Sequence, residues 1–325
     1  MLTYILFVIG FILLIKGADL LVDGAASFAG KFKIPTLVIG LTIVAFGTSA
    51  PELVVNIFAS ISGSADIAIG NILGSNIANI LLILGVSALI FPLKAKKSTI
   101  KKEIPFSLLA ILVLGLLVND LLIDKVELLA GSSGLLSRID GLILLAFFII
   151  FLVYTFGIAK NKPEEVSEGE EIKDLSLARS MAYIGIGIAG LIFGGKWIVD
   201  GAVKIAELFN ASEALIGLTI VAIGTSLPEL ATSAVAAYKK QTDIAIGNAV
   251  GSNIFNLFFV LGISATIKPL PFSASNNIDI GMIVLSTLLL LLALFIGKKR
   301  VIKRWQGAVM VLLYLAYLTF LIIAR

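Results

Sequence analysis

The sequence contains two copies of one pair of motifs, and the second copy lies 177 residues after the first. Residues 39–53 (IGLTIVAFGTSAPEL) and residues 216–230 (IGLTIVAIGTSLPEL) are identical at 13 of 15 positions. Residues 66–79 (DIAIGNILGSNIAN) and residues 243–256 (DIAIGNAVGSNIFN) are identical at 11 of 14 positions at the same shift. Such a repeat indicates a duplicated structural unit, so the fold must contain two related halves.

Both copies are embedded in apolar sequence that is typical of membrane-spanning helices. Of the 325 residues, 59% are hydrophobic and only 14% are charged, and the mean hydropathy is +1.08. A soluble domain typically has about 25% charged residues, so a soluble enzyme is excluded. The apolar runs repeatedly exceed the roughly 18 residues that identify a transmembrane helix. We therefore predict an all-α polytopic membrane protein with ten transmembrane helices, at residues 2–22, 36–61, 67–91, 104–118, 141–158, 180–199, 214–237, 244–267, 278–297 and 305–323.

Ten spans give five to each copy, and this odd number fixes the relative orientation of the two halves. The predicted units are residues 1–159 and 179–325, joined by a polar linker at residues 160–178. Because each unit crosses the membrane an odd number of times, the second must insert upside down relative to the first. Inverted repeats are typical of secondary transporters, which bind their substrates near the bilayer midplane between the two copies.

The distribution of Lys and Arg predicts which side of the membrane each loop occupies. The loops after the odd-numbered spans contain 18 of the 25 basic residues, and the opposite side contains 5. Cytoplasmic loops are enriched in Lys and Arg. We therefore expect a multi-pass protein of the cell (plasma) membrane, with both termini extracellular and the 160–178 linker cytoplasmic. Lys16 and Lys196 lie within spans, where long basic side chains can reach the interface.

The first repeated motif places a carboxylate within a membrane span. It reads Gly-Thr-Ser-x-Pro-Glu and ends at Glu52 in the first copy and at Glu229 in the second. Glycine and proline weaken the helix here, and the freed carbonyl groups suit a cation. An acidic residue at the bilayer centre costs about 2.5–3.5 kcal/mol on insertion scales unless it faces a partner or a wet cavity. Neither motif contains a Lys or Arg, so a bound cation is the expected compensation.

The second repeated motif supplies neutral oxygens. Ser75 and Asn79 are four residues apart and share one helix face, as do Ser252 and Asn256. Asn76 and Asn253 point elsewhere, and we expect them to brace the neighbouring helix break. Asp66 and Asp243 precede spans and fit helix N-terminal roles, whereas Asp23 and Asp200 end the first span of each copy, where we expect them at the membrane surface.

Together, the two motifs predict a cation site made entirely of oxygen. Two bidentate glutamates and two threonine carbonyls give six ligands, and Asn or water completes the six to eight that Ca²⁺ requires. The sequence has no His or Cys, so soft transition metals are poorly served. Two carboxylates are neutralised by one Ca²⁺ or by two Na⁺, so these ions would compete. The candidate metal-binding residues are Glu52, Glu229, Thr48, Thr225, Ser49, Ser226, Ser75, Ser252, Asn79, Asn256, Ala45 and Ala222.

At these residues the sequence resembles the sodium/calcium exchanger family of the cation/calcium exchanger superfamily, especially its short prokaryotic members. Residues 39–79 and 216–256 are similar to the paired alpha repeats of that family. The resemblance implies ten helices, no large regulatory domain, and alternating access in which the first and sixth helices slide against a fixed core. It also implies exchange of about three Na⁺ for one Ca²⁺, which moves net charge across the membrane.

Carried over residue by residue, the resemblance implies a calcium site made of Glu52, Glu229 and the Thr48 and Thr225 carbonyls. The sodium sites would add Ala45, Ser49, Ser75, Ala222, Ser226 and Ser252, with Asn79 and Asn256 as a central polar pair. Some relatives, including potassium-dependent exchangers, have Asp at the position of Asn256. Asn does not ionise, so we expect potassium-independent transport.

Two alternatives remain open at this point. A proton/calcium antiporter of the same superfamily would have Gly-Asn in place of Gly-Thr-Ser before the glutamate, and a cation channel would need a continuous wet pathway. An intramembrane enzyme ranks last because the chain lacks His, Cys and a paired Asp motif. We expect Ca²⁺, Na⁺ and the lipid bilayer as partners, with no nucleic acid, no cofactor and a monomeric chain.

Overall fold

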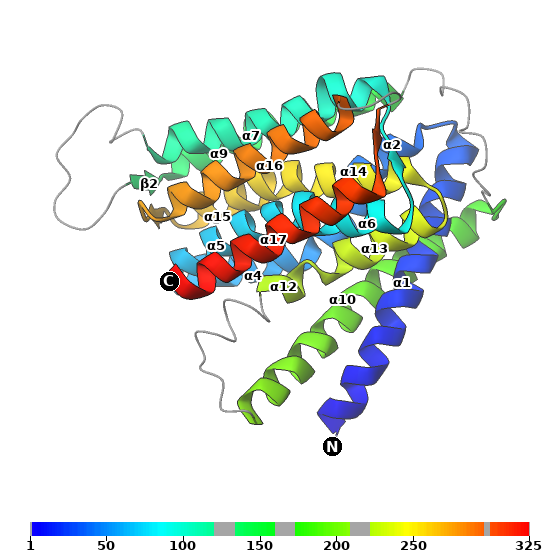
Figure 1. Cartoon of the computed structure of the whole chain (residues 1–325), viewed down its shortest axis with the longest axis horizontal. Coiled ribbons are helices and arrows are strands. Elements are labelled where there is room, and N and C mark those ends of the chain that lie inside the picture. Colours follow the sequence, from blue (N-terminus) through cyan, green and yellow to red (C-terminus); the bar gives the residue numbers. More distant parts are fainter. Residues whose placement is uncertain (1, 120–133, 160–172, 209–221, 296–299, 325) are drawn as a thin grey trace.

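The computed structural model describes residues 2–119, 134–159, 173–208, 222–295 and 300–324. It is a helical bundle from which one pair of helices projects (Figure 1). Seven helical segments are long and apolar enough to cross a membrane, or eight if one bent pair is counted as a span. Five of these are the helices α1 (Leu2–Phe32), α9 (Arg138–Ala159), α10 (Leu177–Leu208), α16 (Asn276–Phe295) and α17 (Arg304–Ala324).

Two long composite helices form the centre of the bundle. The first comprises α5 (Ala65–Ala78), the π-helical turn η2 (Asn79–Ile83) and α6 (Leu84–Ile90), and the second comprises α14 (Thr242–Ile254), η5 (Phe255–Val260) and α15 (Leu261–Ile267). In both, 78% of the most apolar window is buried, against 22–33% in the five helices named above. The segments that carry the second motif therefore lie mostly inside the protein, whereas the five other helices expose most of their apolar surface.

The two segments that carry the first motif are broken helices. In the first copy, α2 (Thr36–Ile39), the π-helical turn η1 (Gly40–Val44) and α3 (Ala45–Thr48) form one run that meets α4 (Ala50–Ser62) at a 48° bend. In the second copy, α12 (Ala222–Thr225) precedes α13 (Leu227–Tyr238). Pro51 and Pro228 lie in the first turn of the later helix, where a missing N–H group is tolerated.

The remaining predicted spans are found in part. A π-helical turn, η3 (Thr99–Glu103), leads into α7 (Ile104–Val118), which matches the predicted fourth span. The expected seventh span begins at residue 214, and residues 214–221 lie outside the described residues. The prediction that the first helix ends at residue 22 is wrong. Because no proline follows before Pro35, α1 continues through Ala25 and Ala26 to Phe32.

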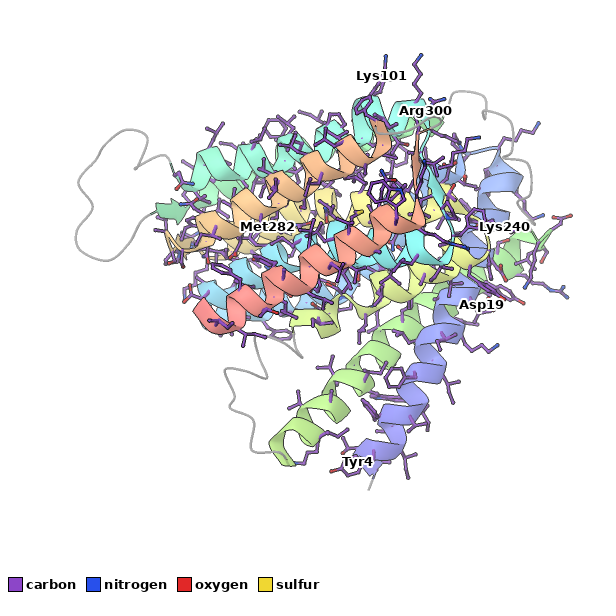
Figure 2. The ribbon with its side chains drawn as sticks, viewed as in Figure 1. Tyr4, Asp19, Lys101, Lys240, Met282 and Arg300 are labelled. Carbon is purple, nitrogen blue, oxygen red and sulfur yellow. The ribbon has the colours of Figure 1, made fainter. Side chains whose placement is uncertain are left out.

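Two short antiparallel strand pairs connect the halves of the chain. The strand β1 (Leu93–Lys94) pairs with β4 (Val301–Ile302), and β2 (Gly134–Leu136) pairs with β3 (Leu270–Phe272). Each pair joins a loop of the first half to a loop of the second. Lys101, Lys240 and Arg300, all counted on the predicted cytoplasmic side, lie near the same end of the bundle (Figure 2).

The helices α1 and α10 pack against each other through glycine. A Cβ atom added at Gly17 would lie 2.8 Å from the Gly187 carbonyl oxygen, and one added at Gly194 would lie 2.8 Å from the Gly10 carbonyl oxygen. Such distances leave no room for side chains, so the two backbones are in direct contact. At 31 and 32 residues, each helix is roughly 47 Å long, which exceeds the roughly 30 Å hydrocarbon core of a bilayer. The pair therefore extends beyond the membrane or crosses it at a tilt.

Candidate functional site

The two broken helices bring Glu52 and Glu229 into the interior of the protein. Each helix breaks at a serine, and the glutamate lies in the first turn of the helix that follows. Both glutamates are fully buried, and hydrogen bonds of Ser49, Ser75 and Ser226 connect the motifs that carry them. A helix N-terminus carries partial positive charge, so the first turn is a favourable position for a carboxylate. Thr48 ends the preceding helix in the first copy and Thr225 does so in the second, so their carbonyl groups lie at the negative ends of helix dipoles.

Serine side chains connect the motifs of the two copies. The Ser49 hydroxyl donates to Glu229 Oε1 at 2.7 Å, which joins the first motif of one copy to the glutamate of the other. The Ser75 hydroxyl donates to Glu52 Oε1 at 3.4 Å, and the Ser226 hydroxyl donates to Ser75 Oγ at 3.2 Å. The residues predicted from both copies therefore form one buried cluster.

The second motif brings its asparagines to the same region through a local change of helix type. The π-helical turn η2 begins at Asn79, and Asn256 lies within the corresponding turn η5. Such turns occur frequently at functional sites because they re-aim side chains. Asn79 Nδ2 donates to Asn253 Oδ1 at 3.0 Å, so Asn253 contacts the first residue of η2. The equivalent contact of Asn76 is not formed among the described residues.

Several buried oxygens of this cluster have no hydrogen-bond donor among the described residues. They include the second carboxylate oxygens of Glu52 and Glu229, the Oδ1 atoms of Asn79 and Asn256, and Ser252 Oγ. Buried polar atoms are almost always satisfied in proteins, so this concentration of oxygens suits a hard cation. Among the described residues, no group of three or more Asp or Glu side chains could hold a metal ion. The cluster thus offers two carboxylates supplemented by neutral oxygens.

Hydrogen bonds join five of the predicted site residues in the structure, namely Glu52, Glu229, Ser49, Ser75 and Ser226. The side chains of Thr48, Ser49, Ser75, Asn79, Ser252 and Asn256 are at most 1% exposed. Thr225 is 8% exposed and Ser226 is 3% exposed, so the second copy of the first motif is the more accessible one. Ala45 begins α3, and Ala222 begins α12.

Sequence reasoning missed two asparagines that contact the site threonines. Asn71 and Asn248 occupy matching positions in the second motif. The Thr48 hydroxyl donates to Asn248 Oδ1 at 3.0 Å, and the Thr225 hydroxyl donates to Asn71 Oδ1 at 3.2 Å. Their position within the repeated motif was the available signal.

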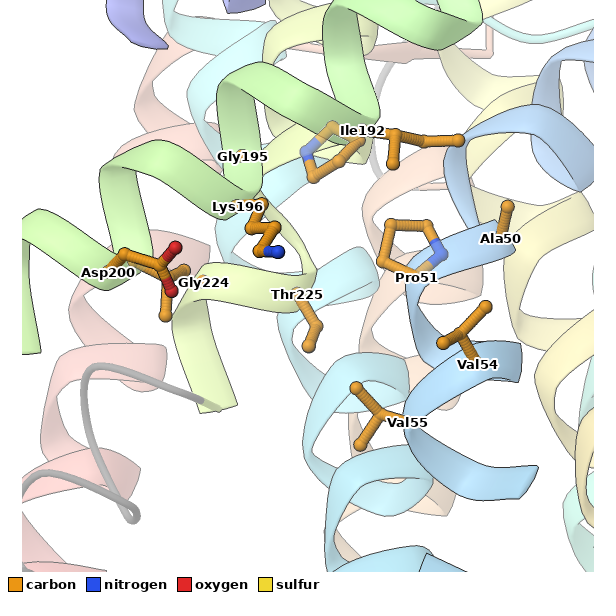
Figure 3. Close-up of a pocket in the computed structure, with 12 residues that line it drawn as sticks. Ala50, Pro51, Val54, Val55, Ile192, Gly195, Lys196, Asp200, Gly224 and Thr225 are labelled. Carbon is orange, nitrogen blue, oxygen red and sulfur yellow. The ribbon is translucent and has the colours of Figure 1, made fainter. Parts of the chain in front are cut away.

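A cavity of about 280 Å³ lies beside the second copy of the first motif. Figure 3 shows α10, α4 and α12 around it, with Thr225 and Pro51 among the lining residues. Val54 and Val55 line one wall, and Lys196 and Asp200 of α10 line the other. Among the described residues that line it, the charged ones are Lys196 and Asp200, and both are exposed. The cavity therefore leads from the α10 side of the bundle to the more accessible site threonine.

Ion pairs connect α1 to the residue that follows α13 and to the segment before α10. Lys239, which follows α13, lies 2.6 Å from both Asp19 Oδ1 and Asp23 Oδ1 of α1. Lys173 lies 2.7 Å from Asp23 Oδ2, and this hydrogen-bonded partner raises the pKa of Lys173. Asp23, which we expect at the level of the membrane surface, has a side chain that is only 5% exposed because Lys173 and Lys239 cover it.

The other charged residues singled out in the sequence occupy helix ends. Asp66 lies in the first turn of α5 and Asp243 in the first turn of α14, so the prediction of N-terminal positions is confirmed. Asp243 is buried, and its carboxylate lies 2.8 Å from Lys96 Nζ. Asp66 is therefore explained by the favourable charge of a helix N-terminus, and Asp243 by the same effect together with its ion pair to Lys96.

Comparisons with known proteins agree with this geometry. The sequence profile of the sodium/calcium exchanger protein family matches residues 2–157 and 179–323. The sodium/calcium exchanger MaX1 of Methanosarcina acetivorans is 32% identical over 345 aligned positions, which cover 98% of both chains. The inner membrane protein YrbG of Escherichia coli K12 is 38% identical over 81% of this chain and 79% of its own. A structure of the sodium-calcium exchanger NCX_Mj superimposes with a TM-score of 0.81 at 34% identity, covering 98% of each chain.

Proposed function

Since this chain belongs to the sodium/calcium exchanger family of membrane antiporters, we propose that it exchanges Na⁺ for Ca²⁺ by alternating access. The observation that carries the proposal is the buried pair Glu52 and Glu229, each of which accepts a hydrogen bond from a serine. Two negative charges in a low-dielectric interior require compensation, and no Lys or Arg lies in either motif. A bound cation supplies that compensation.

In this proposal, Ca²⁺ binds the two glutamates and the carbonyl oxygens of Thr48 and Thr225. Na⁺ ions share the glutamates and add the hydroxyls of Ser49, Ser75, Ser226 and Ser252, with the carbonyls of Ala45 and Ala222. The central Asn79 and Asn256 complete the site through neutral oxygens. Since both ions need the same carboxylates, binding of one displaces the other. The uncompensated site is costly to carry across the membrane, so the protein changes orientation when it is loaded.

In the proposed transport cycle, the ions reach the site from one side of the membrane through the cavity, while the ion pairs block access from the other side. The cavity beside Thr225 gives ions access from the outer side, and the pairs of Lys239 with Asp19 and Asp23 close the cytoplasmic side. Movement of the α1–α10 pair against the central helices would exchange these two states. The proposed topology has ten helices in two inverted repeats (1–159 and 179–325) in the plasma membrane. Both termini lie outside, and the 160–178 linker lies in the cytoplasm.

We propose Na⁺ rather than H⁺ as the coupling ion, with about three Na⁺ per Ca²⁺ and net charge movement. The hydroxyls of Ser49, Ser75 and Ser226 touch the carboxylates or one another, which provides hard neutral ligands for Na⁺. Asn256 keeps the charge of the site at that of two carboxylates, which favours potassium-independent exchange. A proton/calcium antiporter would need the same glutamates to bind protons in place of Na⁺.

The test is Ca²⁺ uptake by vesicles reconstituted with the pure protein. Vesicles loaded with Na⁺, with a proton gradient alone, or with a membrane potential alone are compared in Na⁺-free buffer containing radioactive Ca²⁺. We expect saturable uptake only when Na⁺ is inside, and uptake driven by the proton gradient alone would refute sodium coupling. Glu52→Gln and Glu229→Gln should each abolish uptake. The matched control is Glu103→Gln, which alters a buried glutamate that accepts a hydrogen bond from Tyr154 outside the cluster.

A further inference from the structure

Each site threonine is held by an asparagine from the opposite copy of the repeat. We propose that Asn71 and Asn248 are positioning residues, which orient Thr225 and Thr48 so that their backbone carbonyls face the transported ion. This inference rests on the proposed function, because it concerns the same site. It assigns a role to two side chains that are not ligands.

Asn248 uses all of its main hydrogen-bonding groups to connect the two copies. Its Oδ1 accepts from the Thr48 hydroxyl at 3.0 Å, and its Nδ2 donates to Ser233 Oγ at 2.9 Å and to the Glu229 carbonyl oxygen at 3.2 Å. The side chain is completely buried. Ser233 lies one helical turn after Glu229 on α13. One asparagine thus fixes the threonine of the first copy relative to the backbone that carries the glutamate of the second.

Asn71 makes the corresponding connection in the opposite direction. Its Oδ1 accepts from the Thr225 hydroxyl at 3.2 Å, and its Nδ2 donates to Asn56 Oδ1 at 2.7 Å. Asn56 lies one helical turn after Glu52 on α4, and it donates in turn to the Ala68 carbonyl at 2.9 Å. In each copy, an asparagine therefore contacts the threonine of the other copy and the residue one helical turn after the glutamate of its own copy. The two sets of residues are related by the 177-residue shift.

The location of the threonines explains why their side chains need this support. Thr48 is the last residue of α3, immediately before the break at Ser49, whose backbone N–H still donates to the Ala45 carbonyl at 3.0 Å. The Thr48 hydroxyl lies 3.3 Å from the same carbonyl, which therefore competes with Asn248 for this hydroxyl. Without Asn248, the hydroxyl loses its acceptor on α14, and α3 loses a side-chain connection to the second copy just before the break. Asn248 keeps the hydroxyl directed to α14, which orients the adjoining peptide carbonyl.

The hydrogen bond between Asn248 and Thr48 and the one between Asn71 and Thr225 lie in different surroundings. Asn248 is fully buried and also binds the Glu229 carbonyl, whereas Asn71 is partly exposed and makes no such contact among the described residues. Replacement of Asn248 should therefore weaken ion binding more than replacement of Asn71.

The test measures the affinity of Ca²⁺ alone, in Na⁺-free detergent solution by calorimetry, and Ca²⁺ uptake by reconstituted vesicles. Thr48→Val removes the hydroxyl but keeps the size of the side chain and the backbone carbonyl, so it addresses the tether. One hydrogen bond contributes a net factor of about 3 to 10 in an equilibrium constant, and we expect Thr48→Val and Asn248→Ala each to weaken Ca²⁺ binding by about that factor. Thr48→Ser restores the hydroxyl and should recover most of the loss.

A double-mutant cycle separates positioning from independent damage. If Asn248 acts through Thr48, the double variant binds Ca²⁺ no more weakly than the weaker single variant. A loss equal to the product of the two single losses would overturn the proposal. Asn119→Ala is the control, because Asn119 and Asn277 exchange two hydrogen bonds of 2.8 and 2.9 Å away from the cluster. It should lower thermal stability while Ca²⁺ affinity remains.

The outcomes also distinguish this inference from the proposed function. If the unmodified protein neither binds Ca²⁺ nor performs Na⁺-driven uptake, the proposed function fails. If it does both and Thr48→Val keeps the original affinity, only the positioning role fails. Should Asn248→Ala not fold, Thr48→Val and Thr225→Val still decide the question, because each removes one tether with almost no change in volume.

Discussion

Replacing Gly187 with alanine should destabilise the protein, whereas the same change at Gly185, two residues earlier on α10, should stabilise it. A Cβ atom at position 187 would lie 2.7 Å from the Leu21 backbone nitrogen and 2.8 Å from the Gly17 carbonyl oxygen, both on α1. A Cβ atom at position 185 would have no atom within 4 Å. The two substitutions therefore add the same methyl group to the same helix, and only one of them meets α1.

The magnitudes follow from two opposing effects. Ordinary Cβ contacts begin at 3.4 Å, so α1 would have to retreat by roughly half an ångström, and a gap of that size loses about a quarter or more of the local dispersion attraction. Overpacking of this kind costs about 1–3 kcal/mol. Alanine is favoured over glycine inside a helix by about 0.5–1 kcal/mol. The net expectation is a loss of about 1–2 kcal/mol for Gly187→Ala and a gain of about 0.5–1 kcal/mol for Gly185→Ala.

Unfolding in detergent micelles, followed by tryptophan fluorescence, measures both effects. Trp197 lies on α10 with its ring 6.4 Å from that of Phe193, so its emission reports on this helix. The midpoints of Gly187→Ala and Gly185→Ala should move in opposite directions. If both variants gained stability equally, the backbone contact between α1 and α10 would not exist in solution, and the packing argument would be wrong.

Three further predictions concern charge. Asp23→Asn removes a partner from both Lys239 and Lys173, so stability should fall by about 1.5–3 kcal/mol. In Asp23→Asn, a cysteine introduced at the C-terminal end of α13 should also react faster with a thiol reagent, and no other residue would react because the chain has no Cys. Because Asp23 raises the pKa of Lys173, the contribution of this pair is complete below the usual Lys pKa of about 10.4 and is lost only as the pH rises beyond it. Stability measured from pH 7 to pH 9 should therefore show no loss from this pair, and a loss there would contradict the assignment. Asn256→Asp adds a third ionisable group to the cluster, so Ca²⁺ uptake should acquire a dependence on pH or K⁺. Unchanged uptake from about pH 6 to about pH 9, with and without K⁺, would contradict this expectation.

Much of the site could be predicted from the sequence because its residues are repeated. Glu52 and Glu229 both end the motif Gly-Thr-Ser-x-Pro-Glu within apolar runs, where a carboxylate is energetically costly and is rarely found without a function. The serines that join the two copies were identified for the same reason. Their partners could not be predicted, because Ser49 contacts the glutamate of the other copy while Ser75 contacts that of its own. That choice depends on how the copies pack.

Other features depend on the tertiary structure alone. The burial of Asp23 depends on its ion pairs with Lys173 and Lys239, and nothing in the local sequence shows these partners. The π-helical turns at Asn79 and Asn256 carry no composition that separates them from ordinary helix. Asn71 and Asn248 were visible as repeated positions, but a polar residue next to glycine in a helix has many structural uses. Only their contacts with the opposite threonines reveal the connection.

The strand pairs β1–β4 and β2–β3 have a consequence for how the protein is made. Each pair needs one strand from early in the chain and one from its last third, since Leu93 pairs with Ile302 and Gly134 pairs with Phe272. During synthesis the early strands emerge long before their partners, and they remain open edges until translation is nearly finished. A ribosome stalled after the first five spans would hold an inserted but unfinished half, and quality-control proteases would meet it with unpaired backbone at two loops.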